Sequence, residues 1–196
     1  MSEFRSARLV NGLIALGCVL LFALVYGRYL PWDYAIAPQG DTIRLTGPIF
    51  CDISRHPLLP LLDWTTFEAI YYSPHIVSYY PLLLTYFLDF CDPTSAANAQ
   101  DIVSVLHLAI FFTGCMTIGR VARLSWRDTA IFSLFASVSV CTLALAVFPT
   151  IMASAAWFPF AVAGLLYVLV VDKPLAGVLL LVSGSVLMLA GGPGTN

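Results

Sequence analysis

This sequence has few charged residues for its length. Of its 196 residues, nine are lysine or arginine and eleven are aspartate or glutamate, so 10% are charged. A soluble domain has about 25% charged residues, and this chain has too few to cover a water-facing surface. The net charge of −2 provides no basic field for nucleic acid, and a 60% hydrophobic content is too high for a disordered chain. What is left is an all-α polytopic membrane protein with no nucleic-acid partner.

Recognised chemical motifs are also missing. The sequence contains no glycine-rich phosphate loop, H-E-x-x-H, G-x-S-x-G or C-x-x-C, and no internal repeat. Function must therefore be sought in where individual polar residues lie relative to the apolar segments.

Five apolar segments are predicted to cross the membrane, since a crossing needs about 20 residues. They are residues 9–30, 102–119, 129–148, 151–171 and 174–191. The first follows two arginines, as a signal peptide would, but its apolar run exceeds the usual length of roughly 7–15 residues. We therefore expect a retained anchor.

Basic residues gather in the N-terminus, the 120–128 turn and the 172–174 turn. These three places hold six of the nine: Arg5, Arg8, Arg120, Arg123, Arg127 and Lys173. Five crossings put all three on one side, which the positive-inside rule makes cytoplasmic, together with the N-terminus. A crossing at 76–90 would move the arginine-rich turn outside, so we interpret 64–90 as amphipathic helices at the outer interface.

Residues 31–101 form a predicted outer loop, far longer than the roughly 12–15 residues of most connections, and hold eight of the eleven carboxylates. Asp41 follows Gly40 soon after the first span. Partial desolvation there raises the basicity of a carboxylate and suits it to accept a proton or bind a divalent cation. A turn aspartate is the alternative. Asp33 is the weaker candidate, because a solvated carboxylate at a helix end explains it.

The histidines and two cysteines of this region leave alternatives open. His56 and His75 lack the spacing of metal ligands, so solvated or backbone-bonded rings explain them. His107 lies inside the second span, where an ionisable group usually faces a cavity or a partner, and packing is an equal alternative. Cys51 and Cys91 would close a loop of forty residues in an oxidising compartment, but the sequence does not fix their pairing.

Several short motifs follow one another in a definite order. Gly40-Asp41 is followed by LPLLDW (59–64), YYPLL (79–83), Leu106-His107, Arg120, FP (148–149), WFP (157–159) and AGGPG (190–194). In this order the chain resembles the N-terminal half of the YfhO-like bacterial membrane proteins, which belong with the GT-C type, polyprenyl-phosphate-sugar-dependent glycosyltransferases. We accordingly expect a single membrane domain, residues 1–196, that is the N-terminal part of a longer protein.

The resemblance implies sugar transfer from a polyprenyl-phosphate donor to a cell-envelope glycan or lipid at the outer face of the bacterial inner membrane. Asp41 would match the catalytic aspartate, as general base or as ligand of a divalent cation, the one candidate cofactor. Arg44 and Arg55 would bind the donor phosphate through their guanidinium groups, with a solvated interfacial charge as the equal alternative for each. His56 and His107 are further substrate-binding candidates. The expected partners are the bilayer, the lipid-linked sugar and the remaining C-terminal portion of the chain.

Two alternatives of other classes stand beside this one. A transporter or flippase module would place polar groups and broken helices near the bilayer midplane, where the sequence shows little besides His107. A non-catalytic membrane scaffold would keep the fold without the activity.

Overall fold

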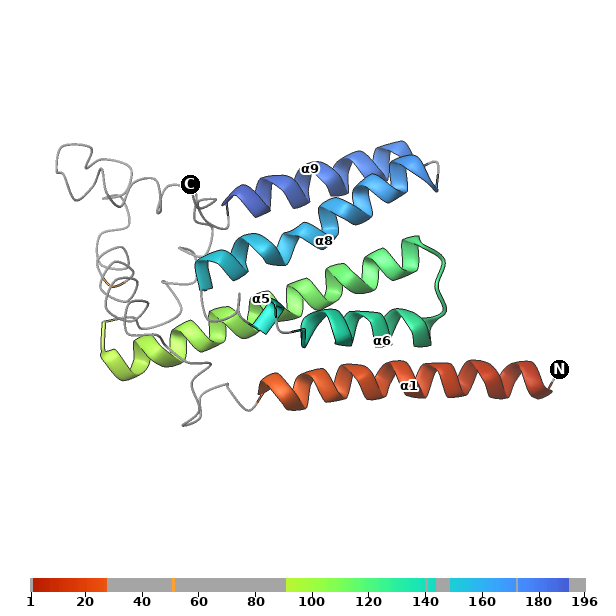
Figure 1. Ribbon diagram of the computed structural model, residues 1–196, viewed down its shortest axis with the longest axis horizontal. Coiled ribbons are helices and arrows are strands. Elements are labelled where there is room, and N and C mark those ends of the chain that lie inside the picture. The colour runs from red at the N-terminus through yellow and green to blue at the C-terminus, as the bar shows by residue number, and fades with distance from the viewer. Residues whose placement is uncertain are drawn as a thin grey trace.

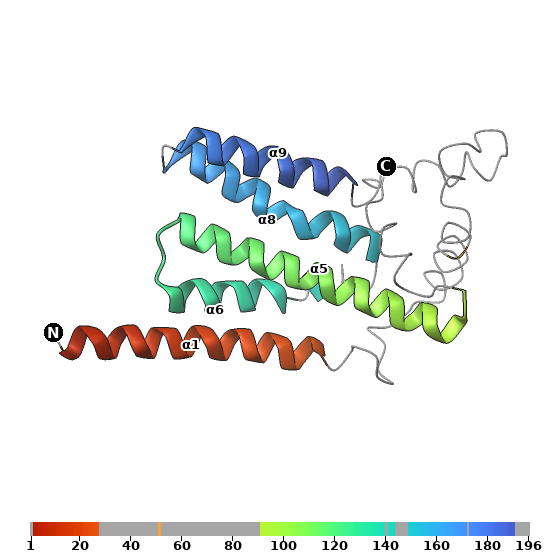
Figure 2. The same cartoon turned by 180° about the vertical axis from the view of Figure 1, so that it is seen from behind.

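The computed structural model describes residues 2–27, 51, 91–139, 141–143, 149–171 and 173–190. This part of the chain is nearly all helical and contains no strand. Its main helices are α1 (Ser2–Gly27), α5 (Pro93–Val121), α6 (Trp126–Ser137), α8 (Pro149–Leu169) and α9 (Pro174–Ala190). They lie roughly side by side in the order α1, α6, α5, α8, α9 (Figures 1 and 2), and the shorter α6 lies between parts of α1 and α5.

Three helices are long and apolar enough to cross a membrane. The apolar stretches are Leu9–Tyr26 in α1, Asp101–Val121 in α5 and Ile151–Leu169 in α8, and α9 adds a shorter one at Pro174–Leu189. Their large apolar side chains are widely exposed, as in Leu24 of α1, which is 73% exposed. Together these helices indicate an all-helical, membrane-embedded protein.

Proline begins three of the helices: Pro93 in α5, Pro149 in α8 and Pro174 in α9. The first amide of a helix has no intrahelical partner, so proline loses nothing at that position and presets the backbone dihedral φ. At α5 the preceding Asp92 caps the helix, because its Oδ2 accepts a hydrogen bond from the Ser95 amide at 3.0 Å.

The expected span at 129–148 is not one continuous helix. α6 ends at Ser137, the chain turns at residues 138–139, and a separate helical turn covers 141–143. Thr142 Oγ1 donates to the carbonyl of Ala136 at 2.7 Å, and the hydroxyls of Ser139 and Thr142 are 2.9 Å apart. These side chains replace backbone hydrogen bonds and so allow the interruption. Residues 144–148 lie outside the described part.

The apolar stretch of α5, Asp101–Val121, matches the predicted second span, 102–119, closely. The helix itself is longer, because α5 begins at Pro93, nine residues before the predicted start of the span. Residues 93–101 were assigned to the outer loop because threonine, serine, asparagine and glutamine lower their hydropathy. Asp101 consequently lies within a helix and is buried.

The helices pack around a core in the middle of the array. Phe22 and Tyr26 of α1 cluster with Phe112 of α5 and with Met152 of α8. The ring centroids of Phe22 and Phe112 are 4.8 Å apart. This core fixes the position of α1 along the axis of α5, since it joins the C-terminal part of α1 to the middle of α5.

The two ends of the array differ in chemistry. The N-terminus of α1, the α5–α6 turn and the α8–α9 turn all lie at one end (Figure 1), which carries Arg120, Arg123, Arg127 and Lys173. We call this the arginine end. At the opposite end α1 finishes and α5 begins at Pro93, two residues after Cys91. We call this the disulfide end.

Candidate functional site

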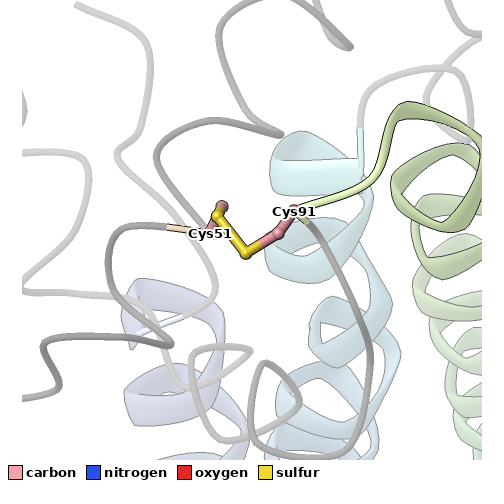
Figure 3. Close-up of a disulfide and its surroundings, with 2 residues drawn as sticks. All are labelled: Cys51 and Cys91. Carbon is pink, nitrogen blue, oxygen red and sulfur yellow. A yellow bond between two sulfur atoms is a disulfide. The ribbon is translucent and has the colours of Figure 1, made fainter.

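A disulfide joins the chain at the disulfide end. Cys51 is bonded to Cys91, forty residues further along, with their Cα atoms 4.7 Å apart (Figure 3). Cys91 lies two residues before α5 begins at Pro93. The sequence left this pairing open, and the structure contains it. The bond closes residues 52–90 into a loop attached at the start of α5.

Three buried polar side chains follow one another along α5 from this end. Asp101 is 6% exposed, Ser104 is 2% exposed and His107 is fully buried. Residues three apart on a helix are neighbours, so the three form a continuous polar row. None of them is unpaired. His107 therefore faces protein and not lipid.

The hydrogen bonding of His107 fixes the role of one ring nitrogen. Nδ1 lies 2.6 Å from the carbonyl of Val103, one turn earlier on α5. A carbonyl only accepts, so Nδ1 carries a proton and donates it. In the neutral ring Nε2 is then the hydrogen-bond acceptor.

The end of α6 at Ser137, where the expected span is interrupted, packs against the core that contains part of α5. The Tyr26 hydroxyl donates to the carbonyl of Ser137 at 2.8 Å in a buried environment. Tyr26 belongs to the same core cluster as Leu108, the neighbour of His107 in sequence. At about 1.5 Å per residue, the 12 residues of α6 span about 18 Å, little more than half of a hydrocarbon core about 30 Å thick. The chain therefore leaves the helix at membrane depth.

Of this polar region only His107 is visible as a candidate in the sequence, since Asp101 falls in the predicted loop and Ser104 has no predicted role. Ser137, Ser139 and Thr142 are the available signal for the interruption, but they lie within a segment that is otherwise apolar.

The remaining candidate residues lie outside the described part of the chain. They are Asp33, Asp41, Arg44, Arg55 and His56, together with the predicted interfacial helices at 64–90. Across the residues that are described, no group of three or more histidine, cysteine, aspartate or glutamate side chains could hold a metal ion. The catalytic aspartate and the divalent cation remain predictions.

Fold and site together define a class: a membrane-embedded helical protein with a disulfide-closed loop at one end and a buried polar row beneath it. Comparison with known proteins goes no further, because no family model, curated protein or solved structure matches the chain.

Proposed function

We propose that the chain is part of an integral-membrane glycosyltransferase that moves a sugar from a polyprenyl-phosphate donor to a cell-envelope acceptor. The proposal rests first on the order of motifs that resembles the YfhO-like family. The reaction would take place at the disulfide end, on the outer face of the bacterial inner membrane, with the N-terminus in the cytoplasm. Asp41 would act as general base or would bind a divalent cation.

The observation that supports this location is the Cys51–Cys91 disulfide. It ties the segment containing the candidate phosphate ligands to the start of α5. Arg55 follows Cys51 by four residues, and an extended chain advances at most about 3.5 Å per residue. Chain length alone therefore keeps Arg55 within about 14 Å of the disulfide. A polyprenyl phosphate has its phosphate at the membrane surface, so a site tied to a helix end matches its depth.

The arrangement of the turns supports the proposed orientation of the chain in the membrane. The α5–α6 and α8–α9 turns lie at one end with the N-terminus of α1, as five crossings require. Their arginines and lysine favour the cytoplasmic side. The disulfide at the other end favours an oxidising compartment.

A transporter or flippase is the second candidate, favoured by the interruption after Ser137. Transporters place discontinuous helices near the bilayer midplane, where the exposed backbone binds the substrate. Here the carbonyls of Ala136 and Ser137 already accept hydrogen bonds from Thr142 and Tyr26. The interruption is thus stable without a ligand, and we rank transport second.

Substitution of Asp41 by asparagine tests the enzyme proposal. The protein would be reconstituted in vesicles that contain a radiolabelled polyprenyl-phosphate-linked hexose and cell-envelope glycan as acceptor. We expect Asp41→Asn to lower the transfer rate by about 100-fold or more, the usual contribution of a general base. Asp89→Asn, a change of the same type in the same predicted loop but outside the motifs that carry the resemblance, is the matched control and should keep full activity.

Two results would contradict the proposal. Unchanged transfer by Asp41→Asn would remove the assigned base. Movement of the intact donor between leaflets, without transfer and with loss of movement in Tyr26→Phe, would establish the transporter instead.

A further inference from the structure

The turn that joins α5 to α6 has an unusual residue at its centre. The Leu124 amide donates to the Gly119 carbonyl at 3.0 Å, and the Arg123 amide donates to the Arg120 carbonyl at 3.1 Å. This pair of bonds is the Schellman arrangement, in which the residue after the helix cap adopts a left-handed backbone and is usually glycine. Here that residue is Arg123, with φ of 61°.

A left-handed backbone costs free energy for any residue with a Cβ atom, and glycine would avoid that cost. Arg123 is exposed, so burial does not compensate for the strain. Residues held in such backbone regions cluster at functional sites, so the conformation of Arg123 supports a functional hypothesis for its side chain. What Arg123 adds at this position is a positive charge on the surface of the arginine end.

The guanidinium group of Arg120, three residues earlier in the chain, is held in place by the turn. Its Cζ atom lies 4.3 Å from the centre of the Trp126 ring, and its Nη1 donates to the carbonyl of Leu124 at 2.7 Å. This contact uses one of the five N–H donors of the guanidinium group. The planar group is thus oriented by a ring and a carbonyl before any ligand arrives.

The charges of the turn do not cancel. Arg127 pairs with Asp128, with Nε and Oδ1 2.9 Å apart, and this is the one ion pair found among the described residues. Arg120 and Arg123 are left as two positive charges without a carboxylate partner there. Because the apolar stretch Asp101–Val121 ends at this turn, both arginines lie where the membrane surface is expected.

We propose that the α5–α6 turn binds the phosphate of an anionic membrane phospholipid between Arg120 and Arg123. Guanidinium groups bind phosphate oxygens through paired hydrogen bonds. Apolar side chains that can contact the acyl chains lie at the turn itself, since Leu124 and Trp126 are 40% and 54% exposed. These side chains select a lipid over free phosphate. The site is independent of the proposed sugar transfer and lies at the opposite end of the molecule.

Thermal unfolding in detergent micelles tests the site, with phosphatidylglycerol or phosphatidylcholine added at equal mole fraction. We expect phosphatidylglycerol to raise the unfolding midpoint of the wild type and phosphatidylcholine to leave it nearly unchanged. Arg123→Gly should unfold at a higher temperature than the wild type in detergent alone, because glycine relieves the strain. The same variant should lose about half or more of the shift produced by phosphatidylglycerol.

Lys173→Gly is the matched control, because it removes a positive charge from the same end but from the other turn. It should keep the full response to phosphatidylglycerol. Asparagine tolerates the left-handed backbone and carries no charge, so Arg123→Asn should behave as Arg123→Gly does. Equal shifts with both lipids, a full response in Arg123→Gly, or the same shift with inorganic phosphate alone would overturn the proposal.

Discussion

Asp128 shows how one side chain can define the start of a helix. Ser125 caps α6, and its Oγ accepts a hydrogen bond from the Asp128 amide at 3.1 Å. The same hydroxyl donates to Asp128 Oδ2 at 2.7 Å. This hydrogen bond from Ser125, followed by the one from Arg127, lowers the pKa of Asp128 below its ordinary value. The ionised carboxylate therefore stabilises the turn.

The stability of the protein should depend on the ionisation of Asp128. Because its pKa is lower in the folded state, its contribution is complete above the ordinary aspartate value and is lost as pH falls through the folded-state pKa. We expect Asp128→Asn to be less stable than the wild type at neutral pH and to approach it in acid. Unfolding midpoints measured from pH 7 to pH 3 would show this.

Ser125→Ala serves as the control for this experiment, since it removes the largest cause of the lowered pKa. Its pH dependence should be weaker than that of the wild type. A gap between wild type and Asp128→Asn that stays constant across the pH range would contradict the assignment.

At the scale of the elements, α8 and α9 form the closest helix pair. A Cβ atom added at Gly164 would collide with the Leu181 amide and would lie 2.7 Å from the Gly177 carbonyl. Both are backbone atoms, which cannot move unless the helix moves. Small residues at such positions let membrane helices approach closely.

Gly164→Ala should therefore destabilise the protein by about 1–3 kcal/mol, the usual cost of overpacking. Gly17→Ala on α1 is the matched control, because an added Cβ there meets nothing within 4 Å. It should be neutral, or stabilising by up to about 1 kcal/mol through helix propensity. Unfolding in a mixed denaturing detergent would compare the two, and equal effects would show that the contact does not hold α8 and α9 together.

The elements that could be predicted from the sequence are those whose structure depends on a single property. The apolar stretches of α1, α8 and α9 fall within their predicted spans, because hydropathy alone determines which segments avoid water. Elements whose ends depend on a distant part of the chain could not be predicted. The end of α6 depends on Tyr26, more than a hundred residues earlier, and on Thr142. The end of α5 at Val121 lies two residues beyond the predicted end of the span at 119, but the left-handed backbone of Arg123 had no sequence signal, because glycine is the usual residue at that position.

The candidate site could likewise be predicted only in part. An ionisable residue inside a span was visible as His107, but its burial depends on which helices surround α5. Asp101 and Ser104 were not recognised, because membership of a polar row requires knowing that α5 starts at Pro93. For Asp41 the sequence supplies a motif, and its role awaits the transfer assay.

At the scale of the whole molecule, the disulfide is the one covalent link between distant parts of the described chain. Replacing Cys51 or Cys91 by serine should lower stability by up to about 4 kcal/mol, the chain-entropy value for closing a loop of this length. The double variant should be no worse than either single one. Unfolding midpoints with and without a reductant would measure the effect.

Cys141→Ser is the control for this experiment, since Cys141 is an exposed free thiol. It should leave the midpoint unchanged in either condition. The reductant should lower the wild type to the level of the Cys51→Ser variant. A wild type that is indifferent to reductant would show that the bond contributes nothing to stability.

The short length of α6 also bears on how the protein enters the membrane during synthesis. Twelve residues that include Arg127 and Asp128 are too few to partition into lipid unaided. α5 emerges first and is long enough to insert alone, so α6 must follow it as the second arm of a helical hairpin. At its far end the carbonyls of Ser137 and Ala136 accept hydrogen bonds from Tyr26 of α1 and from Thr142. Because Thr142 follows α6 in the chain, this end of the helix can be completed only after Thr142 has been synthesised.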